Sequence, residues 1–422
     1  HYYKNRMSKE IPGIYNWTRH DGPSMPVRSP RPRVEIDDET WRDGIQGTHV
    51  VHHPNTNQKA FYIETAATLG FIDHLDIGFP ASGPMHRDEI VTLIDFSQKK
   101  KLNVTFSTAG RGAAIDDIKS IIEIAQRTGE KVEADLFIDV SYLRADVEGW
   151  SRDEKLRQTM NNIALAKKEG LSVMFVPERA SVTSPKELFD ACVMAADEGV
   201  DRIALADTTG ALTPYGTSQL LRTMFENLGK RYPEIKFDFH EHEDLNMGIA
   251  NCVVAAMEGI DRLHATARGI GERAGNVSLE KLLVVLNLQG FRAMDTSHIQ
   301  TFARMAADIL SIPIVSHEPI VGEKSTETAS GVHASTYEKV RKGDLPPIYF
   351  AYDPKDVGLT ARVRIGPVSG LANVYAYCEE LGIRDVTEEK AREVLDLAKK
   401  NWSLLSADEV RNVIGRKGLS VK

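Results

Sequence analysis

The sequence has few cysteines, no long hydrophobic run and no excess of basic residues. Its three cysteines, Cys192, Cys252 and Cys378, lie far apart and form no CxxC pair, which argues against a disulfide framework or a cysteine zinc site. No run approaches the roughly 18 apolar residues of a transmembrane helix. The polar N-terminus lacks the apolar centre of a secretory signal. We therefore expect a cytoplasmic protein that has no membrane partner.

The charge and composition are those of an ordinary globular protein. A net charge of −8 leaves no basic excess to neutralise phosphates, so we expect no nucleic-acid partner. Apolar residues make up 42% and charged residues 27% of the 422 positions. At roughly 100–200 residues per domain, this length corresponds to two or three domains, or to one large barrel with appendages.

Short runs rich in Val, Ile, Leu and Phe alternate with helical patterns along the first part of the chain. Such runs are typical of strands that are buried on both faces. Several of the helical patterns end at a glycine, which is the expected left-handed cap, and Ser184-Pro185 with Glu187 is a well-formed helix start. The runs are RVEIDDE from Arg33, HLDIGFP from His74, NVTFSTAG from Asn103, VEADLFIDV from Val132, LSVMFVPE from Leu171, DRIALADTTG from Asp201, KFDFHEHEDL from Lys236 and DRLHATARGIGE from Asp261.

Two α/β folds compete for this pattern, an open doubly wound sheet and a closed (β/α)8 TIM barrel. Strict alternation of eight strands and eight helices favours the barrel. No GxGxxG follows the first strand, which argues against a dinucleotide-binding sheet. We predict an N-terminal arm over residues 1–32, the barrel over 33–290 and a mainly helical C-terminal appendage over 291–422. The arm either forms an oligomer contact or is a partly ordered tail.

Ionisable residues gather where the predicted strands end, which is where such barrels have their active sites. His240 and His242 are two apart in a strand, so both would face the barrel mouth. With Asp43, after the first strand, they make a set of two histidines and one carboxylate that suits a divalent metal. The alternative is a polar cluster of hydrogen-bonded histidines. Asp43 and Asn276 at neighbouring strand ends favour the metal.

Arg42 and Glu178 are further candidates at the same end of the barrel. The Arg42 guanidinium could hold an oxygen on which negative charge develops, or it could form a structural ion pair with Asp43 or Glu178. Glu178 could act as a general base or orient one. The glycine-rich ATARGIGERAGN from Ala265 could contact an anion at a helix start, or simply form a tight turn.

Several motifs resemble those of the DRE-TIM metallolyases, a family that includes the 2-isopropylmalate, homocitrate and Re-citrate synthases. DETWRDGIQG from Asp38 resembles their DTTLRDGEQ signature, and HEHEDLNMGIAN from His240 resembles their HxHND-G-A-N stretch. GIGERAGNVSLE from Gly269 matches the synthases almost letter for letter. Beyond the barrel, ASGVHASTYEK from Ala329 resembles their SGIHxDGxLK loop, so the resemblance extends into the appendage.

The resemblance implies an acyltransferase of the EC 2.3.3 type, which performs a Claisen condensation of acetyl-CoA with a 2-oxo acid. Asp43, His240 and His242 would bind one divalent ion, Mn²⁺, Mg²⁺, Zn²⁺ or Co²⁺, with Asn276 in or just behind its coordination shell. The 2-oxo acid would chelate this ion. A hydroxyacyl-CoA lyase or aldolase on the same barrel is an alternative, although the appended segments resemble the synthases.

The resemblance also implies roles for other side chains. Arg42 would stabilise the oxyanion, and Thr208 and Gln46 would contact the substrate. His333, in the appended loop, would remove a proton from the acetyl-CoA methyl group, assisted by Glu178 and Tyr349. In this family that loop commonly reaches into the barrel of a partner subunit, which implies a homodimer.

Three arginines bear on the choice of the 2-oxo acid. Arg144 follows the fourth strand, Arg179 lies beside Glu178, and Arg268 follows the eighth strand. An arginine in the pocket favours an acceptor with a second anionic group, so we predict one such as oxaloacetate or 2-oxoglutarate. Alternatively, these arginines pair with neighbouring carboxylates, and the enzyme takes an apolar 2-oxo acid, as 2-isopropylmalate and citramalate synthases do.

Overall fold

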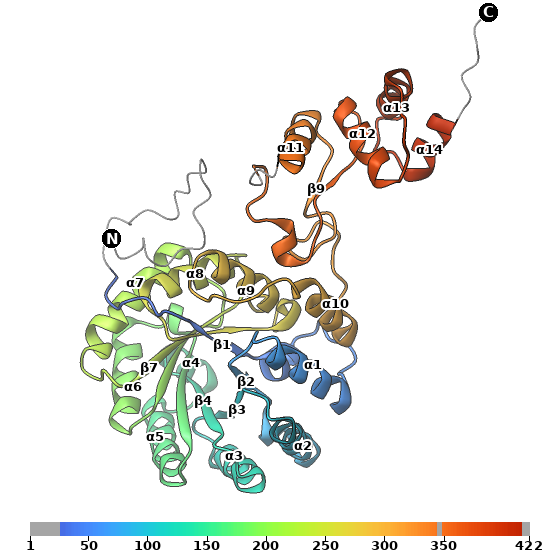
Figure 1. The fold of residues 1–422 in the computed structure, drawn as a ribbon. Coiled ribbons are helices and arrows are strands. Elements are labelled where there is room, and N and C mark those ends of the chain that lie inside the picture. Colours follow the sequence, from blue (N-terminus) through green and yellow to red (C-terminus); the bar gives the residue numbers. More distant parts are fainter. Residues whose placement is uncertain (1–25, 344–347, 416–422) are drawn as a thin grey trace, which may run out of the picture. The chain divides into compact units, whose positions relative to one another are not determined.

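The computed structural model describes residues 26–343 and 348–415, and it contains a closed barrel of parallel strands (Figure 1). The strands follow each other around the barrel in sequence order, and the last pairs with the first. This confirms the predicted (β/α)8 barrel. Its strands are β1 (Glu35–Asp38), β2 (His74–Asp76), β3 (Thr105–Arg111), β4 (Glu133–Asp139), β5 (Ser172–Glu178), β6 (Arg202–Asp207), β7 (Lys236–Glu241) and β8 (Arg262–Ala265).

Helices form a ring around these strands, as Figure 1 shows. Ser184 caps α6 by accepting a hydrogen bond from the Glu187 backbone N–H, and Pro185 opens that helix, as predicted. Gly129 and Gly259 end α3 and α8 with positive φ angles of 65° and 92°. The helices are α1 (Thr56–Thr68), α2 (Pro84–Lys100), α3 (Ile115–Thr128), α4 (Tyr142–Glu148), α5 (Arg152–Lys168), α6 (Pro185–Asp197), α7 (Pro214–Met224), α8 (Gly248–Glu258), α9 (Leu279–Leu288) and α10 (Ile299–Leu310).

The barrel interior is charged, whereas the outward faces of its strands are apolar. Outward residues such as Ile36 and Phe239 are fully buried beneath the helices. Inside, Arg262 of β8 reaches across to Glu133 of β4 and also pairs with Asp238 of β7. Both faces of the strands are therefore buried, as predicted, but the outward face is apolar and the inward face is charged. The interior is filled with ion pairs in place of layers of aliphatic side chains. Removal of one partner would leave a buried charge unpaired, which is costly to the stability of the fold.

Glu241 of β7 points to the helix side of the barrel and is almost fully buried. Burial and the negative charge of Asp207 raise the pKa of Glu241 from 4.5 to about 10. In the unfolded chain the carboxyl ionises near its ordinary pKa, so stability falls as the pH rises between about 4.5 and 10. We expect Glu241→Gln to raise the midpoint of urea unfolding at pH 8 and to leave it nearly unchanged at pH 4. A variant less stable than the parent at pH 8 would contradict this.

The described chain forms two compact units. The first comprises the described residues up to Asp295 together with Thr301–Pro313, and the second comprises Thr296–Gln300 and the described residues from Ile314 onward. The predicted boundary at residue 290 assigns α10 to the appendage, but most of this helix belongs to the barrel unit. The Phe302 ring lies 5.4 Å from Tyr62 and 5.2 Å from Phe71, so the apolar face of α10 packs on the barrel unit.

The second unit is mainly helical, as predicted. Helices α12 to α14 enclose a small apolar core that includes Val374, Val394 and Val410. His333 lies in the first turn of α11, not in the loop that the sequence predicts, because the Ala334 backbone N–H already donates to the Ser330 carbonyl at 2.9 Å. The elements are β9 (Glu327–Thr328), α11 (Gly331–Gly343), β10 (Arg362–Val363), α12 (Leu371–Glu380), α13 (Glu388–Asn401) and α14 (Ala407–Gly415).

The described end of the predicted N-terminal arm packs against the barrel. The Arg28 guanidinium lies over the Phe225 ring at 4.8 Å from its centroid and pairs with Asp261 at 3.0 Å. Arg31 pairs with the same carboxylate at 2.6 Å. These contacts hold residues 28–31 beside the start of β8. The remainder of the arm, residues 1–25, lies outside the described residues, and an oligomer contact there stays a prediction.

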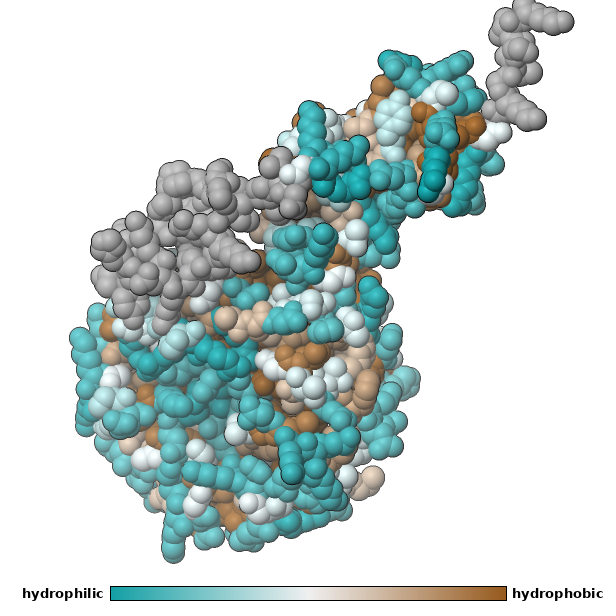
Figure 2. All heavy atoms as spheres, in the orientation of Figure 1, coloured by the Kyte–Doolittle hydropathy of each residue, from teal (hydrophilic) through white to brown (hydrophobic). Residues whose placement is uncertain are grey.

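The visible face of the barrel unit is largely hydrophilic, with apolar residues in small groups (Figure 2). Among the described residues, no helix has both the length and the apolarity needed to cross a membrane. The three cysteines are buried and unpaired.

Candidate active site

A cavity of about 180 Å³ opens at the carboxyl ends of the barrel strands. The structure brings seven of the predicted site residues to its wall: Arg42, Asp43, Gln46, Glu178, Thr208, His240 and His242. Apolar side chains, among them Phe137, Met174 and Val176, line another part of it. The cavity therefore combines an ionic part with an apolar part, the usual composition of a small-molecule site.

Asp43, His240 and His242 converge at this cavity. The two Nε2 atoms lie 3.1 Å apart, and the nearer Asp43 carboxylate oxygen lies 3.8 Å from His240 Nε2 and 3.5 Å from His242 Nε2. Ligands at ~2.1 Å from one ion, separated by roughly 90–110°, stand ~3.0–3.4 Å apart. The observed separations are close to this range, so the three side chains fit one divalent ion.

Asn276 is placed beside the same carboxylate. Its side-chain N–H donates to Asp43 at 2.8 Å and to the Ile270 carbonyl at 3.1 Å. Its Oδ1 atom is buried without a hydrogen-bond partner among the described residues, so it is available as a further ligand. Gly271 permits this arrangement, since a Cβ atom there would lie 2.3 Å from Asn276 Nδ2. The orphaned amide oxygen is a second observation that fits a metal.

The protonation states also suit a metal. Burial, with the neighbouring His240, lowers the pKa of His242 to about 4, which leaves its imidazole neutral. Burial alone would raise the pKa of Asp43, but Arg42 and His240 outweigh it and the pKa falls below its ordinary value. A neutral imidazole and an ionised carboxylate are the forms that bind metal ions.

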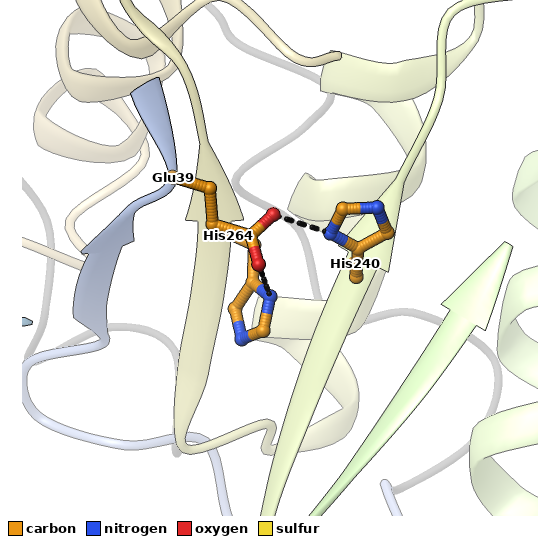
Figure 3. A group of neighbouring side chains, drawn as sticks. All are labelled: Glu39, His240 and His264. Atoms are coloured by element: carbon orange, nitrogen blue, oxygen red, sulfur yellow. Dashed lines mark ion pairs between the residues drawn. The ribbon is translucent and has the colours of Figure 1, made fainter. Parts of the chain in front are cut away.

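Glu39 and His264 form a layer behind these ligands that the sequence did not identify (Figure 3). Glu39 Oε2 lies 2.7 Å from His240 Nδ1, and Glu39 Oε1 lies 3.2 Å from His264 Nδ1. A carboxylate that accepts from Nδ1 fixes the imidazole with its Nε2 lone pair toward the cavity. Glu39 therefore orients His240.

We expect Glu39→Gln to weaken metal binding by about 10- to 100-fold, because a carboxamide fixes and polarises the imidazole less well. Titration of the metal-free protein with Mn²⁺ measures the effect. Glu35→Gln, at the start of β1 whereas Glu39 directly follows its end, is the matched control and should bind as the parent does. Equal affinities for Glu39→Gln and Glu35→Gln would show that Glu39 has no orienting role.

Arg42 is held by carboxylates on several sides. It pairs with Asp76 at 2.6 Å, with Asp43 at 2.7 Å and with Glu39. The ion pair with Asp43 that the sequence left as an alternative is present, while Arg42 still lines the cavity. Burial would lower its pKa, but these carboxylates raise the pKa well above its ordinary value. The guanidinium is a fixed positive charge beside the candidate metal ligands.

Glu178 and Thr208 stand elsewhere on the cavity wall. Burial and the nearby Asp139 carboxylate raise the pKa of Glu178. Thr208 Oγ1 accepts a hydrogen bond from the Arg179 backbone N–H at 2.9 Å. Arg273 also lines the cavity, where it pairs with Asp244 at 2.8 Å and donates to the Thr208 carbonyl. Arg273 was not among the site residues predicted from the sequence.

Five predicted site residues are absent from this cavity lining, and one of them is Asn276, which donates to Asp43. Arg268 is buried and pairs with Glu280 at 2.7 Å, and Arg144 pairs with Glu148 on the surface of α4 at 2.8 Å. His333 and Tyr349 belong to the second unit, where their rings stack with centroids 4.0 Å apart. The third arginine considered for specificity, Arg179, pairs with Asp139 at 2.9 Å, as the alternative interpretation expected.

Comparison with known proteins identifies the barrel. Residues 33–309 match the HMGL-like family. The chain is 28% identical to a homocitrate synthase of Sulfolobus acidocaldarius over 89% of this chain and 77% of that protein. It is also 28% identical to a 2-isopropylmalate synthase of the same organism, over 89% of this chain and 94% of that protein.

Solved structures agree on the fold. The HMG-CoA lyase of Bacillus subtilis superimposes with a TM-score of 0.56 at 20% identity, over 68% of this chain and 97% of that one. The carboxyl transferase domain of Rhizobium etli pyruvate carboxylase superimposes with a TM-score of 0.53 at 16% identity, over 88% of this chain and 62% of that one. The family match covers more than half of the sequence, and the chain belongs to the HMGL-like (DRE-TIM) family.

Proposed function

We propose that this protein catalyses a metal-dependent Claisen condensation of acetyl-CoA with a 2-oxo acid, releasing CoA. The convergence of Asp43, His240 and His242 beside the Arg42 guanidinium carries the proposal, because it joins a metal-binding set to a fixed cation. Family membership supports a divalent metal. The similarity to two synthases over 89% of the chain, including much of the second unit, supports condensation.

The proposed metal is held by Asp43, His240 and His242, with the free Asn276 oxygen as a further ligand. When bound, the ion polarises the ketone of the 2-oxo acid and orients the substrate. Arg42 donates to the ketone oxygen as it becomes an alkoxide, where the developing negative charge is greatest. Thr208 and Gln46, on the cavity wall, bind the substrate carboxylate end.

His333 is the proposed base. It is exposed in the first turn of α11, and its ring stacks on Tyr349, which limits its rotation. The base removes a proton from the acetyl methyl group, and the resulting carbanion attacks the ketone carbon. Glu178, whose pKa is raised by burial, donates a proton to the product alkoxide. Water then cleaves the thioester, which makes the reaction effectively irreversible.

An anionic acceptor, such as oxaloacetate or 2-oxoglutarate, is the proposed substrate class. Arg273 supports this class, because it lines the cavity itself. Its guanidinium is paired with Asp244 and would engage the acceptor with its remaining N–H donors.

Release of free CoA thiol tests the proposal. The protein is mixed with acetyl-CoA, Mn²⁺ or Mg²⁺ and one 2-oxo acid at a time, and an EDTA sample is the control. We expect metal-dependent release with one acceptor, and highest kcat/KM for a dicarboxylic one. The panel holds glyoxylate, pyruvate, 2-oxoisovalerate, phenylpyruvate, oxaloacetate, 2-oxoglutarate and phosphonopyruvate. A preference for 2-oxoisovalerate or pyruvate would contradict the proposed acceptor class while supporting the condensation.

Hydroxyacyl-CoA cleavage is the second candidate, since HMG-CoA lyases are among the similar structures and match the barrel almost end to end. The same metal and Arg42 would serve that reaction in reverse. Incubation with hydroxymethylglutaryl-CoA discriminates, because a lyase releases acetoacetate. Acetoacetate release without condensation for any acceptor would replace the synthase proposal.

A further inference from the structure

Another group of possible metal ligands lies inside the barrel and shares no residue with the Asp43 set. Asp37 of β1, His74 of β2 and Asp135 of β4 each offer one ligand atom, and these atoms lie within 4.8 Å of one another. All three side chains are at least nine-tenths buried. Asp37 Oδ2, His74 Nε2 and both carboxylate oxygens of Asp135 have no hydrogen-bond partner among the described residues. We call these three residues the interior cluster.

The hydrogen bonds around His74 fit a tautomer that carries its proton on Nδ1. When the Thr105 hydroxyl donates to the Asp73 carbonyl at 3.3 Å, it offers a lone pair to His74 Nδ1, which lies 2.6 Å away. In this tautomer His74 Nε2 presents a lone pair to the interior cluster, and it lies 3.6 Å from a Glu133 carboxylate oxygen.

In this tautomer the interior cluster is made of acceptors that face one another, and no donor among the described residues hydrogen-bonds to these atoms. Arg262 does not fill this role, because its guanidinium is engaged by Glu133 and Asp238 and stands 3.8 Å from Asp37 Oδ2. His264 stands 3.7 Å from the same oxygen. Acceptors turned toward each other in a dry interior require a cation, a proton or water at their centre.

We propose that the interior cluster binds a second divalent metal ion, held by His74 Nε2 and the carboxylates of Asp37 and Asp135. One imidazole nitrogen with two carboxylates suits Mn²⁺, Co²⁺ or Zn²⁺ better than Mg²⁺ or Ca²⁺, which prefer all-oxygen sites. Asp135 also lines the active-site cavity, so the interior cluster adjoins the barrel mouth. The ion would stabilise the barrel by neutralising its acidic interior.

The test uses the full-length protein and does not depend on its activity. The parent and a His240→Ala/His242→Ala variant, which lacks the mouth ligands, are stripped with a chelator, loaded with Mn²⁺ and freed of unbound metal. We expect about two ions per chain for the parent and about one for the variant. Pulsed electron paramagnetic resonance of the variant should show coupling to a single histidine nitrogen. Adding His74→Gln should remove both the ion and this coupling, whereas adding His86→Gln, the control, should remove neither.

Thermal unfolding is a second measurement, and it needs no substitution in the interior cluster. In the His240→Ala/His242→Ala variant, saturating Mn²⁺ should raise Tm by about 5 °C or more, since an ion that binds only the folded chain stabilises it. No bound Mn²⁺ and no rise of Tm in this variant would overturn the proposal, and protons and water would then occupy the interior. An ion that persists after His74→Gln would equally overturn it.

Discussion

Replacing His242 by Ala should lower metal-dependent release of CoA by at least about a thousandfold, because polarisation of the acceptor by the metal contributes several kcal/mol. His242 is 3% exposed and its Nε2 lies 3.1 Å from that of His240, so an alanine there takes one imidazole out of the proposed metal-binding set. The rate is measured with the best acceptor of the panel and saturating Mn²⁺. Metal content after gel filtration should fall in parallel.

His52→Ala is the matched control for this variant, since His52 is exposed on the loop that follows Asp43 and lines none of the described cavities. We expect it to keep the parent rate and the parent metal content. Circular dichroism and Tm establish that both variants are folded. A folded His242→Ala protein that retains more than about a tenth of the parent rate would show that His242 is not a ligand of the catalytic metal.

The fold was accessible from the sequence because a parallel barrel leaves a strong local pattern. The strands have apolar residues on the side that faces the helices, such as Ile36 and Phe239. These residues alone are enough to identify a strand in the sequence. The composition of the interior was not accessible. Asp37 and Arg262 occupy alternate positions in their strands, and only closure of the barrel shows that such residues face each other.

The candidate metal set was accessible for a simple reason. His240 and His242 share one strand face, and strand ends meet at one edge of a barrel, so Asp43 follows from topology. Glu39 was not found, because its role depends on a contact between β1 and β7 that no local pattern encodes. Arg268 was placed in the pocket by its strand end. Its backbone has a φ of 58°, however, and its N–H and guanidinium both turn to Glu280.

The second large expected effect is complementation between two inactive variants, one of which lacks His333. If the base acts on the barrel of a partner subunit, a His333→Ala protein and an Asp43→Asn protein are each inactive alone but complement each other when mixed. Asp43→Asn removes a proposed metal ligand of the barrel unit, while His333→Ala removes the proposed base of the second unit. A mixed dimer then has one active site that contains both defects and one that contains neither.

After equimolar mixing under conditions that exchange subunits, we expect about a quarter of the parent CoA-release rate, because about half of the dimers are mixed and each has one intact site. Size-exclusion chromatography with light scattering establishes the dimer, and tagged subunits confirm the exchange. Mixing Asp43→Asn with His242→Ala is the control, since both substitutions lie in the barrel unit, so each barrel of a mixed dimer carries one of them and no site is intact. That mixture should stay inactive.

A fully exchanged His333→Ala and Asp43→Asn mixture that also stays inactive would show that the base does not act between subunits. An active His333→Ala protein would show that His333 is not the base.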